Sequence, residues 1–304
     1  MEHVKIGTRS SKLALWQTNF IANELQKKYP NLKIEIINIK TTGDKILDSP
    51  LSKIGGKGLF TKEIEIQMLE KKIDLAVHSL KDVPSELDEN FSTAAVTKRF
   101  DPFDAFVSNK FKSFGELPDN ALIGTSSLRR RAQLLKINPN LKIENLRGNV
   151  DTRLKKLDEG NFDAIILAAA GLKRLGYENR ITEILSPEKI LPAVGQGALA
   201  IEILSSNFEI RELVKFLDDE KSHIETNAER GFLKIVGGGC QVPIGVFSKI
   251  FDNKISVEAI ISSVDGKIFV REKIVGEICD AVKIGENLAK KMLENGGQKI
   301  LMQN

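Results

Sequence analysis

The chain contains Ile6-Gly7-Thr8-Arg9-Ser10-Ser11 near its start and a close repeat, Ile123-Gly124-Thr125-Ser126-Ser127, in its middle. In each stretch a β-rich run ends in Ile-Gly-Thr, and serines follow where a helical pattern begins. Serine is a strong helix N-cap, and the free N–H groups of a helix N-terminus bind anions. Either stretch alone indicates only an ordinary capped helix. Because the pattern occurs twice, it predicts two related lobes, each with an anion-binding edge toward a shared cleft.

Outward from these stretches, short β-rich runs alternate with helical patterns. Strands are expected around Ile123 and at residues 4–6, 33–39, 74–77, 142–146 and 163–167, and helices at residues 13–28, 61–72, 127–137 and 150–159. The residues expected to face the core from the first two helices and their flanks are Leu13, Trp16, Phe20, Leu25, Phe60, Ile64, Met68 and Leu69. Such alternation is typical of mostly parallel sheets that helices cover on both faces.

The last third of the chain has a different pattern. Strands are expected at residues 245–251, 254–262 and 267–275, and the turn signals Asp252-Asn253 and Asp265-Gly266 separate them. A helix is expected at residues 281–295, before Gly296-Gly297. An antiparallel meander with a helix predicts a third, small α+β domain that begins near residue 220.

Composition argues against several classes of protein. The 304 residues, 41% of them hydrophobic, suffice for two or three domains with a large core. The 45 basic and 41 acidic side chains leave a net charge of +4, too balanced for a nucleic-acid protein, and 6% aromatic residues give little base stacking. No apolar run approaches the ~20 residues of a membrane span. With two cysteines and a strand-like run directly after Met1, we expect no disulfide framework, no secretory leader and a cytoplasmic location.

Arginine is concentrated in one part of the chain. Residues 129–180 hold seven of the 12 arginines but only five of the 33 lysines. These arginines are Arg129, Arg130, Arg131, Arg147, Arg153, Arg174 and Arg180. A guanidinium binds a carboxylate or phosphate through two parallel hydrogen bonds and stays charged when partly buried. The alternative is a solvated basic face. The concentration favours a cleft for a small, acidic polyanion, with Arg9 facing it from the other lobe.

A glycine-rich loop, Gly55-Gly56-Lys57-Gly58, lacks the spacing of a phosphate-binding P-loop. Together with Thr42-Gly43-Asp44-Lys45, it predicts a mobile, charged lid that carries Asp44 and Lys57. An ordinary surface loop is the alternative.

Cys240 follows the glycines at 237–239 and precedes Pro243 by three residues. Glycines let a bulky group approach the backbone, and an exposed thiol among cations is nucleophilic. With three histidines in the chain and no second clustered cysteine, neither a thiol protease nor a metal site is expected. The remaining hypotheses are a covalent attachment point and a small buried hydrophobe. Cys279 is expected to lie in the core or to be inert.

Polar residues follow the predicted buried strand at 74–77, where open α/β sheets place their ligands. Asp82 is either a turn residue before Pro84 or a carboxylate that faces the arginines. In the second case it stays ionised and can stabilise a developing cation. His78 is more typical of a core histidine whose hydrogen bonds are satisfied.

Seven motifs, in order, resemble those of the porphobilinogen deaminase (hydroxymethylbilane synthase) family from end to end. They are GTRSSKLA (residues 7–14), GGKGLF (55–60), AVHSLKDVP (76–84), GTSSLRR (124–130), LRGNV (146–150), LPAVGQG (191–197) and GGCQVPIG (238–245). Two positions depart from the family pattern or extend it. Gly237 replaces a commonly acidic residue, and Arg131 extends the arginine pair.

The resemblance implies an α/β fold of three domains. Two are lobes like those of periplasmic binding proteins, with doubly wound mixed sheets, and the third is a small α+β domain with a three-stranded antiparallel sheet that carries the cysteine. The expected boundaries are residues 1–97 with 198–215 for the first, discontinuous lobe, 98–197 for the second lobe and 220–304 for the third domain.

The resemblance also implies roles for single residues. Cys240 would carry a dipyrromethane cofactor through a thioether, and Asp82 would contact the pyrrole N–H groups and support each condensation. The residues that would bind the carboxylates of cofactor, substrate and product are Arg9, Ser11, Lys81, Ser127, Arg129, Arg130, Arg147, Arg153 and Arg174. Four porphobilinogen molecules would be joined with loss of ammonia, and hydrolysis would release the linear tetrapyrrole. We expect a cytoplasmic monomer with no metal, nucleic-acid or membrane partner. The rival hypotheses are a non-catalytic anion-binding protein of the same two-lobed fold and a nucleic-acid binder that uses residues 129–131.

Overall fold

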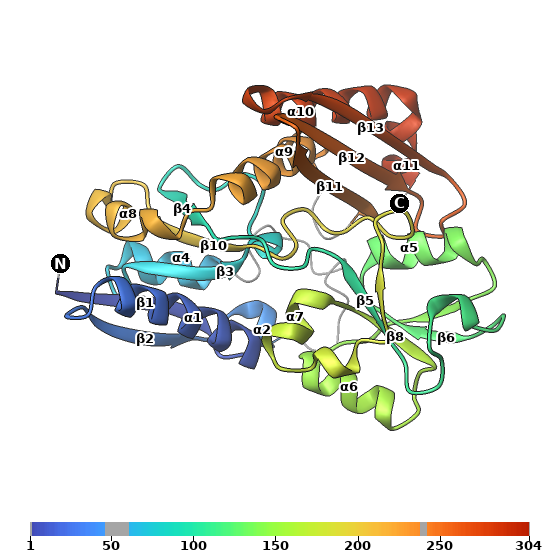
Figure 1. The fold of residues 1–304 in the computed structure, drawn as a ribbon, viewed down its shortest axis with the longest axis horizontal. Helices are drawn as coiled ribbons and strands as arrows, with labels where there is room; N and C mark the ends of the chain where they lie inside the picture. The colour runs from blue at the N-terminus through green and yellow to red at the C-terminus, as the bar shows by residue number, and fades with distance from the viewer. Residues whose placement is uncertain (1, 46–60, 238–241, 304) are drawn as a thin grey trace.

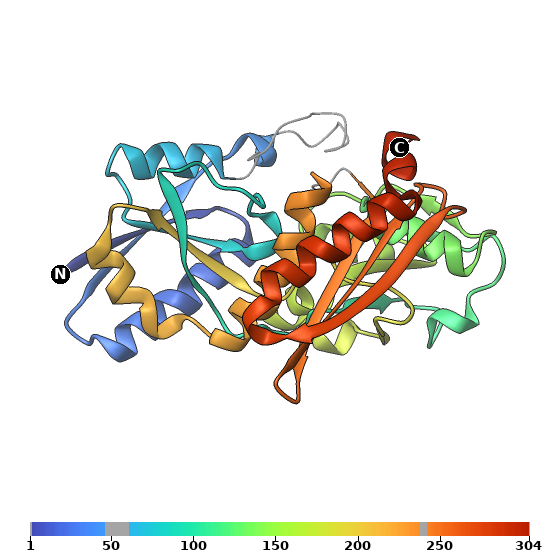
Figure 2. The same ribbon diagram turned by 90° about the horizontal axis from the view of Figure 1, so that it is seen from above.

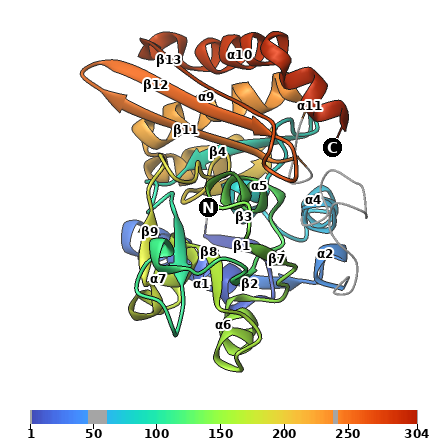
Figure 3. The same ribbon diagram turned by 90° about the vertical axis from the view of Figure 1, so that its right-hand side faces the viewer.

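The structure, a computed structural model, describes residues 2–45, 61–237 and 242–303. It has three parts, two lobes side by side and a smaller unit packed against both (Figure 1). The two lobes are also seen side by side from above (Figure 2), and a view along the long axis shows the third unit over the overlapping lobes (Figure 3). None of the helices in the described ranges combines the length and hydropathy that a bilayer-spanning helix requires.

The first lobe is a five-stranded mixed sheet in the order β2-β1-β3-β10-β4, together with its helices. The strands are β1 (His3–Arg9), β2 (Lys33–Ile39), β3 (Leu75–Ser79), β4 (Phe91–Val96) and β10 (Leu199–Leu204). Strand β1 pairs in parallel with β2 and β3, whereas β10 is antiparallel to both β3 and β4. The sheet therefore brings β10 next to β3 and β4, although β10 lies about a hundred residues later in the sequence.

Helices cover both faces of this sheet. They are α1 (Lys12–Lys28), α2 (Thr42–Lys45), α4 (Lys62–Leu69) and α8 (Phe208–Val214). Because side chains alternate along a strand, Leu75 and Val77 of β3 face the core beneath α1 and α8, whereas Ala76 faces Ile64 and Met68 of α4.

The second lobe repeats this arrangement in the order β7-β6-β8-β5-β9. Its elements are β5 (Asp104–Val107), β6 (Leu122–Gly124), β7 (Lys142–Glu144), β8 (Ala164–Ala168), β9 (Glu183–Leu185), α5 (Leu128–Ile137), α6 (Val150–Asp158) and α7 (Ala169–Arg174). Strand β6 is parallel to β7 and β8, and β5 is antiparallel to β8 and β9. Half of the pairings in each lobe are thus antiparallel, so the expectation of mostly parallel sheets is wrong and that of mixed sheets is confirmed.

The third unit is a three-stranded antiparallel sheet packed against two helices. It contains α9 (Glu220–Val236), β11 (Ile244–Phe251), β12 (Lys254–Ser262), β13 (Phe269–Glu277), α10 (Ala281–Met292) and α11 (Gln298–Gln303). A kink at Gly296, whose φ is 104°, separates the last two helices. Short 3₁₀ turns lie at η1 (Leu80–Asp82), η2 (Phe114–Glu116), η3 (Glu178–Arg180), η4 (Lys215–Leu217) and η5 (Ile278–Asp280). The expected fold class, α/β with two mixed-sheet lobes and a small α+β unit, is confirmed.

The three parts meet at Glu229 of α9. Its carboxylate accepts hydrogen bonds from Arg99, on the segment between β4 and β5, at 2.6 Å, from the Gly195 amide at 2.8 Å and from the Ser248 amide at 2.9 Å. The pair Arg99–Glu229 is buried. One carboxylate therefore ties the two connections between the lobes to the third unit.

Four expectations about burial are corrected, and a fifth concerns a residue outside the described ones. Trp16 and Phe20 are each 38% exposed, because α1 instead buries Gln17, which donates a hydrogen bond to Ser79 at 2.8 Å. Leu69 is exposed at the last position of α4. Cys279 is exposed in the turn before α10, and Phe60 lies outside the described residues.

Candidate functional site

The expected site residues that the structure describes lie at the carboxyl ends of the parallel strands. In the first lobe, Arg9 ends β1, and Lys81 and Asp82 follow β3 in η1. In the second lobe, Arg129 and Arg130 follow β6 in the first turn of α5. Arg147 follows β7, Arg153 lies on α6, and Arg174 ends α7 after β8. This is the edge at which open α/β sheets bind ligands.

Two serines cap the helices that begin at this edge. The Ser11 hydroxyl accepts from the Ala14 amide at 3.3 Å, and the Ser127 hydroxyl accepts from the Arg130 amide at 3.4 Å. The glycine that ends the Ile-Gly pair before each of these helices packs closely against apolar side chains. A Cβ on Gly124 would lie 3.0 Å from three apolar side chains, and one on Gly7 would overlap Ile73. The repeated sequence therefore gives the same strand-to-helix connection twice.

Asp104, at the start of β5, holds two of the arginines. Its carboxylate is fully buried and accepts from Arg129 at 2.7 Å, from Arg130 at 2.7 Å and from Gln196 at 2.9 Å. Burial alone would raise the pKa of Asp104, but the charges and hydrogen bonds of the two arginines outweigh it and hold the pKa well below its usual range. Asp104 therefore stays ionised and fixes both guanidiniums.

Gln196 connects this cluster to the first lobe. Its amide nitrogen donates to Asp104, and its amide oxygen accepts from the Lys81 ammonium at 3.3 Å. Desolvation, opposed by Asp82 and reinforced by the positive charge of Arg130, lowers the pKa of Lys81 to about 8. The lowered pKa of Lys81 thus reflects mainly the burial of its ammonium between the two lobes.

Arg153 and Arg147 extend the positive region along the second lobe. The Nε of Arg153 donates to the Gly148 carbonyl at 2.8 Å. Desolvation, together with the charges of Arg130 and Arg147, lowers the pKa of Arg153 to about 10. The positive charges of these side chains therefore repel one another, and an anion bound among them would offset that repulsion.

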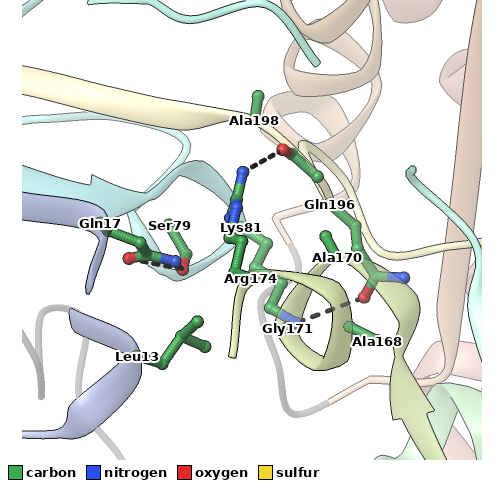
Figure 4. A pocket seen from close by; sticks show the side chains of 11 residues that line it. Leu13, Gln17, Ser79, Lys81, Ala168, Ala170, Gly171, Arg174, Gln196 and Ala198 are labelled. Atoms are coloured by element: carbon green, nitrogen blue, oxygen red, sulfur yellow. Dashed lines mark hydrogen bonds between the residues drawn. The ribbon is translucent and has the colours of Figure 1, made fainter. Parts of the chain in front are cut away.

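Arg174 lies between the lobes. Its guanidinium donates to the Gly197 carbonyl at 2.6 Å and lies 5.9 Å from the Trp16 ring centroid and 5.8 Å from that of Phe100. Desolvation lowers the pKa of Arg174 to about 10. Figure 4 shows Lys81 and Arg174 in the small cavity, of about 30 Å³, that α1 and α7 line from opposite sides.

Comparison with known proteins gives one consistent family. Residues 4–212 match the model described as "Porphobilinogen deaminase, dipyromethane cofactor binding domain", and residues 223–294 match "Porphobilinogen deaminase, C-terminal domain". The chain is 48% identical over 303 residues to porphobilinogen deaminase of Geobacter sulfurreducens, covering 100% of this chain and 95% of the relative. It is 50% identical over 300 residues to that of Trichlorobacter lovleyi, covering 99% and 96%. The chain belongs to the porphobilinogen deaminase family.

Solved structures with a similar arrangement include immunogenic lipoprotein A from Vibrio vulnificus, with a TM-score of 0.46 at 16% identity over 72% of this chain and 96% of that one. The methionine-binding protein MetQ has a TM-score of 0.45 at 15% identity over 71% and 89%.

Three of the predicted site and lid residues lie outside what the structure describes. These are Cys240, Lys57 and the side chain of Asp44. Gly237, the departure from the family pattern, ends α9 with φ 68° and ψ 18°, a left-handed conformation that glycine favours at a helix C-terminus. The other unusual residue, Arg131, donates to the Ile143 carbonyl of β7 at 3.4 Å. Within the described ranges, no group of three or more metal-ligating side chains occurs.

Asp82 and His78 differ in their surroundings. The half-buried Asp82 ends η1 beside Lys81. His78 is buried inside the first lobe, and its Nε2 lies 2.9 Å from the buried Glu202 carboxylate. The interpretation of His78 as a satisfied core histidine is confirmed.

Asp104, Gln196 and Gln17 belong to the site but were not predicted from the sequence. Gln196 lies within one of the seven motifs, and Asp104 opens an otherwise apolar run in which a buried charge requires a partner. Those two signals were present in the sequence. Gln17 gave none, since it lies in an ordinary helical pattern.

Proposed function

We propose that this chain acts as a hydroxymethylbilane synthase, with Asp82 as its catalytic carboxylate and Cys240 as the attachment point of its dipyrromethane cofactor. The enzyme is a transferase. It joins four porphobilinogen molecules in sequence, with loss of ammonia at each step, and hydrolysis then releases the linear tetrapyrrole. The observation that carries the residue assignment is the position of Asp82, at the end of β3 and next to a cluster whose cations outnumber its carboxylates.

The described residues fit a cofactor that bears several carboxylates. Arg129 and Arg130 share the single carboxylate of Asp104, and the Nε of Arg130 is buried with no hydrogen-bond partner among the described residues. Burial lowers the pKa of both Lys81 and Arg153. Further carboxylates at this edge would give these groups hydrogen-bond partners and opposite charges. The other predicted residues that border the same edge are Arg9, Ser11, Ser127, Arg147 and Arg174. When bound, dipyrromethane supplies the free pyrrole α-carbon that receives the first porphobilinogen.

The chain's own residues then account for substrate binding and charge stabilisation. The arginines bind the acetate and propionate groups of porphobilinogen through paired hydrogen bonds. As ammonia leaves the aminomethyl group, positive charge develops on the substrate pyrrole. The Asp82 carboxylate offsets that charge and accepts a hydrogen bond from the pyrrole N–H. Because the neighbouring fixed charges are mostly positive, Asp82 is the group that favours a cationic intermediate.

The organisation of the chain is part of the proposal. We assign residues 1–97 and 198–215 to the first lobe, 98–197 to the second and 220–304 to the third domain. The return of β10 into the first sheet and the start of α9 at Glu220 support these boundaries. Asp44 and Lys57 belong to the lid. We further propose a cytoplasmic monomer without a nucleic-acid partner.

The test combines intact mass with turnover. Wild-type protein, denatured, is expected to exceed its sequence mass by two linked pyrrole units, and Cys240→Ser is expected to show no excess. Asp82→Asn should keep the mass excess but lose at least ~100-fold in ammonia release, because the neutral amide cannot stabilise the cation. Asp82→Glu should recover part of the rate.

Two outcomes would overturn the proposal. Active wild-type protein at bare sequence mass would remove the covalent assignment. Turnover of Asp82→Asn within a few-fold of wild type would make Asp82 a turn residue. The rival hypothesis of a non-catalytic anion-binding protein predicts instead that the chain binds porphobilinogen and releases no ammonia.

A further inference from the structure

Arg230 of α9 joins the third unit to the loop that follows Asp82. Its Nη1 donates to the Val83 carbonyl at 3.3 Å, and its Nη2 donates to the Pro84 carbonyl at 2.6 Å and the Ser85 carbonyl at 3.2 Å. Among the described residues, Arg230 is the sole hydrogen-bond donor to these three carbonyls. Arg230 is half-buried, and desolvation by burial lowers the pKa of its guanidinium from the usual value.

The backbone on the other side of Asp82 is held by the first lobe. The Leu80 amide donates to the Ala198 carbonyl at 3.0 Å, and the Val83 amide closes η1 on the Leu80 carbonyl at 3.1 Å. Asp82 therefore lies between two anchors, β10 of its own lobe on one side and Arg230 of the third unit on the other. Removing the second anchor leaves three carbonyls without their donor and the C-terminal side of Asp82 unsupported.

The position of Arg230 is itself fixed. Its neighbour on α9, Glu229, forms the buried ion pair with Arg99 at 2.6 Å. Six residues after Arg230, α9 ends at Val236, and Cys240 follows in the sequence. The same helix thus leads toward the cysteine and supports the loop of the aspartate.

We propose that Arg230 is a positioning residue for Asp82. This inference rests on the proposed role of Asp82. By holding the three carbonyls after it, Arg230 keeps the Asp82 carboxylate where positive charge develops on the substrate. A displacement of about 1 Å at a reacting group can cost ~10²-fold in rate.

The chain offers a matched control in Arg271 of β13. Its Nη1 donates to the Glu188 carbonyl at 2.9 Å and its Nη2 to the Pro187 carbonyl at 2.9 Å. Arg271 therefore joins the third unit to backbone carbonyls of the second-lobe connection, away from Asp82. Replacing either arginine by glutamine removes hydrogen bonds to backbone carbonyls of a lobe. Arg271→Gln also removes an ion pair with Glu258 at 2.7 Å, so the control variant loses at least as many contacts.

The experiment measures ammonia release by Arg230→Gln and Arg271→Gln, with each rate divided by the cofactor-loaded fraction from intact mass. Arg230→Gln is expected to lower kcat at least ~10-fold with KM changed less than about three-fold. Arg230→Lys, which retains a cationic donor, should recover part of kcat. Arg271→Gln should stay within about three-fold of wild type. Equal effects at both arginines would mean that docking of the third unit, and not Asp82, is what matters.

A double-mutant cycle separates this inference from the function it rests on. In an Asp82→Asn background, Arg230→Gln should cost less than about three-fold, because the carboxylate it positions is gone. A full, multiplicative loss in that background would overturn the positioning role. If Asp82→Asn alone keeps the wild-type rate, the proposed function of Asp82 fails whatever Arg230 does. If Arg230→Gln does not fold, the cycle is run with Arg230→Lys, and an unchanged kcat for that folded variant would refute the inference.

Discussion

Replacing Asp104 by asparagine tests whether the arginine cluster depends on its internal counter-ion. The substitution keeps the shape of the side chain and removes its charge. Arg129 and Arg130 would then be buried cations without the carboxylate that each meets at 2.7 Å. Exposed fractions of 6% and 7% for the two side chains leave little access to water.

The expected loss of stability in Asp104→Asn follows from the burial of these ion pairs. Removing one partner of a buried ion pair costs about 3–5 kcal/mol. Unfolding entropy of ~2.1 cal/mol/K per residue gives about 0.64 kcal/mol/K for cooperative unfolding of 304 residues. Asp104→Asn should therefore lower Tm by about 5–8 °C. Because the folded-state pKa of Asp104 is depressed, its contribution is complete above its unfolded pKa of about 4 and is lost as the pH falls below it. The difference from wild type should be constant between about pH 5 and 8.

Thermal and urea unfolding of both proteins at pH 7 measure this difference, and intact mass reports cofactor loading. Asp158→Asn is the control, because its partner Arg180 lies at 2.6 Å in an exposed pair of the same lobe, and such a pair contributes about 0–1 kcal/mol. A loss below about 1 kcal/mol for Asp104→Asn would refute the view that the arginines rely on Asp104.

Three further predictions concern other parts of the molecule. Arg129→Lys and Arg130→Lys should lose most activity in the ammonia-release assay because lysine lacks the planar fork, whereas Arg180→Lys should be nearly silent; equal losses at all three would mean that only charge matters. In the Cys240→Ser protein, the free energy of unfolding should rise between about pH 8 and 10.5. The reason is that the pKa of folded Lys81 is lowered to about 8, so Lys81 loses its proton at a lower pH in the folded than in the unfolded chain. Urea unfolding of Cys240→Ser/Lys81→Met should lack this rise. Gly285→Ala should lower the free energy of unfolding in urea by about 1–3 kcal/mol, because a Cβ there would overlap the Ala228 carbonyl. Gly115→Ala should lower it far less, because a Cβ there would lie 3.9 Å from the Ser113 hydroxyl.

The fold could be predicted to the extent that its signals are local. The Ile-Gly-Thr repeat is a local signal, and it correctly indicated two lobes with the same strand-to-helix connection. The antiparallel insertion of β10 into the first sheet is not, because β10 pairs with β3 across more than a hundred residues. That pairing entered only through the family resemblance.

The site shows the same limit. The concentration of arginine is visible in the sequence. The carboxylate that orients two of these arginines belongs to Asp104 on β5, a strand that runs antiparallel to its neighbour β8. The buried face of α1 was predicted wrongly at Trp16 and Phe20. Hydropathy alone predicts that the aromatic rings are buried, but the helix lies beside a cavity with polar side chains and buries Gln17 there. The role of Asp82 came from its place after a buried strand, and it stays a prediction until turnover is measured.

Helices α9 and α10 cross where Gly231 lies against the Val282 carbonyl and Gly285 against the Ala228 carbonyl. At such a crossing the two backbones touch, so no side chain is available to re-pack and let one helix slide along the other. The two helices therefore form one tightly packed pair within the third unit. We expect any rearrangement of the third unit as the product lengthens by one pyrrole at each step to occur at segments outside α9 and α10, and not as sliding within that pair.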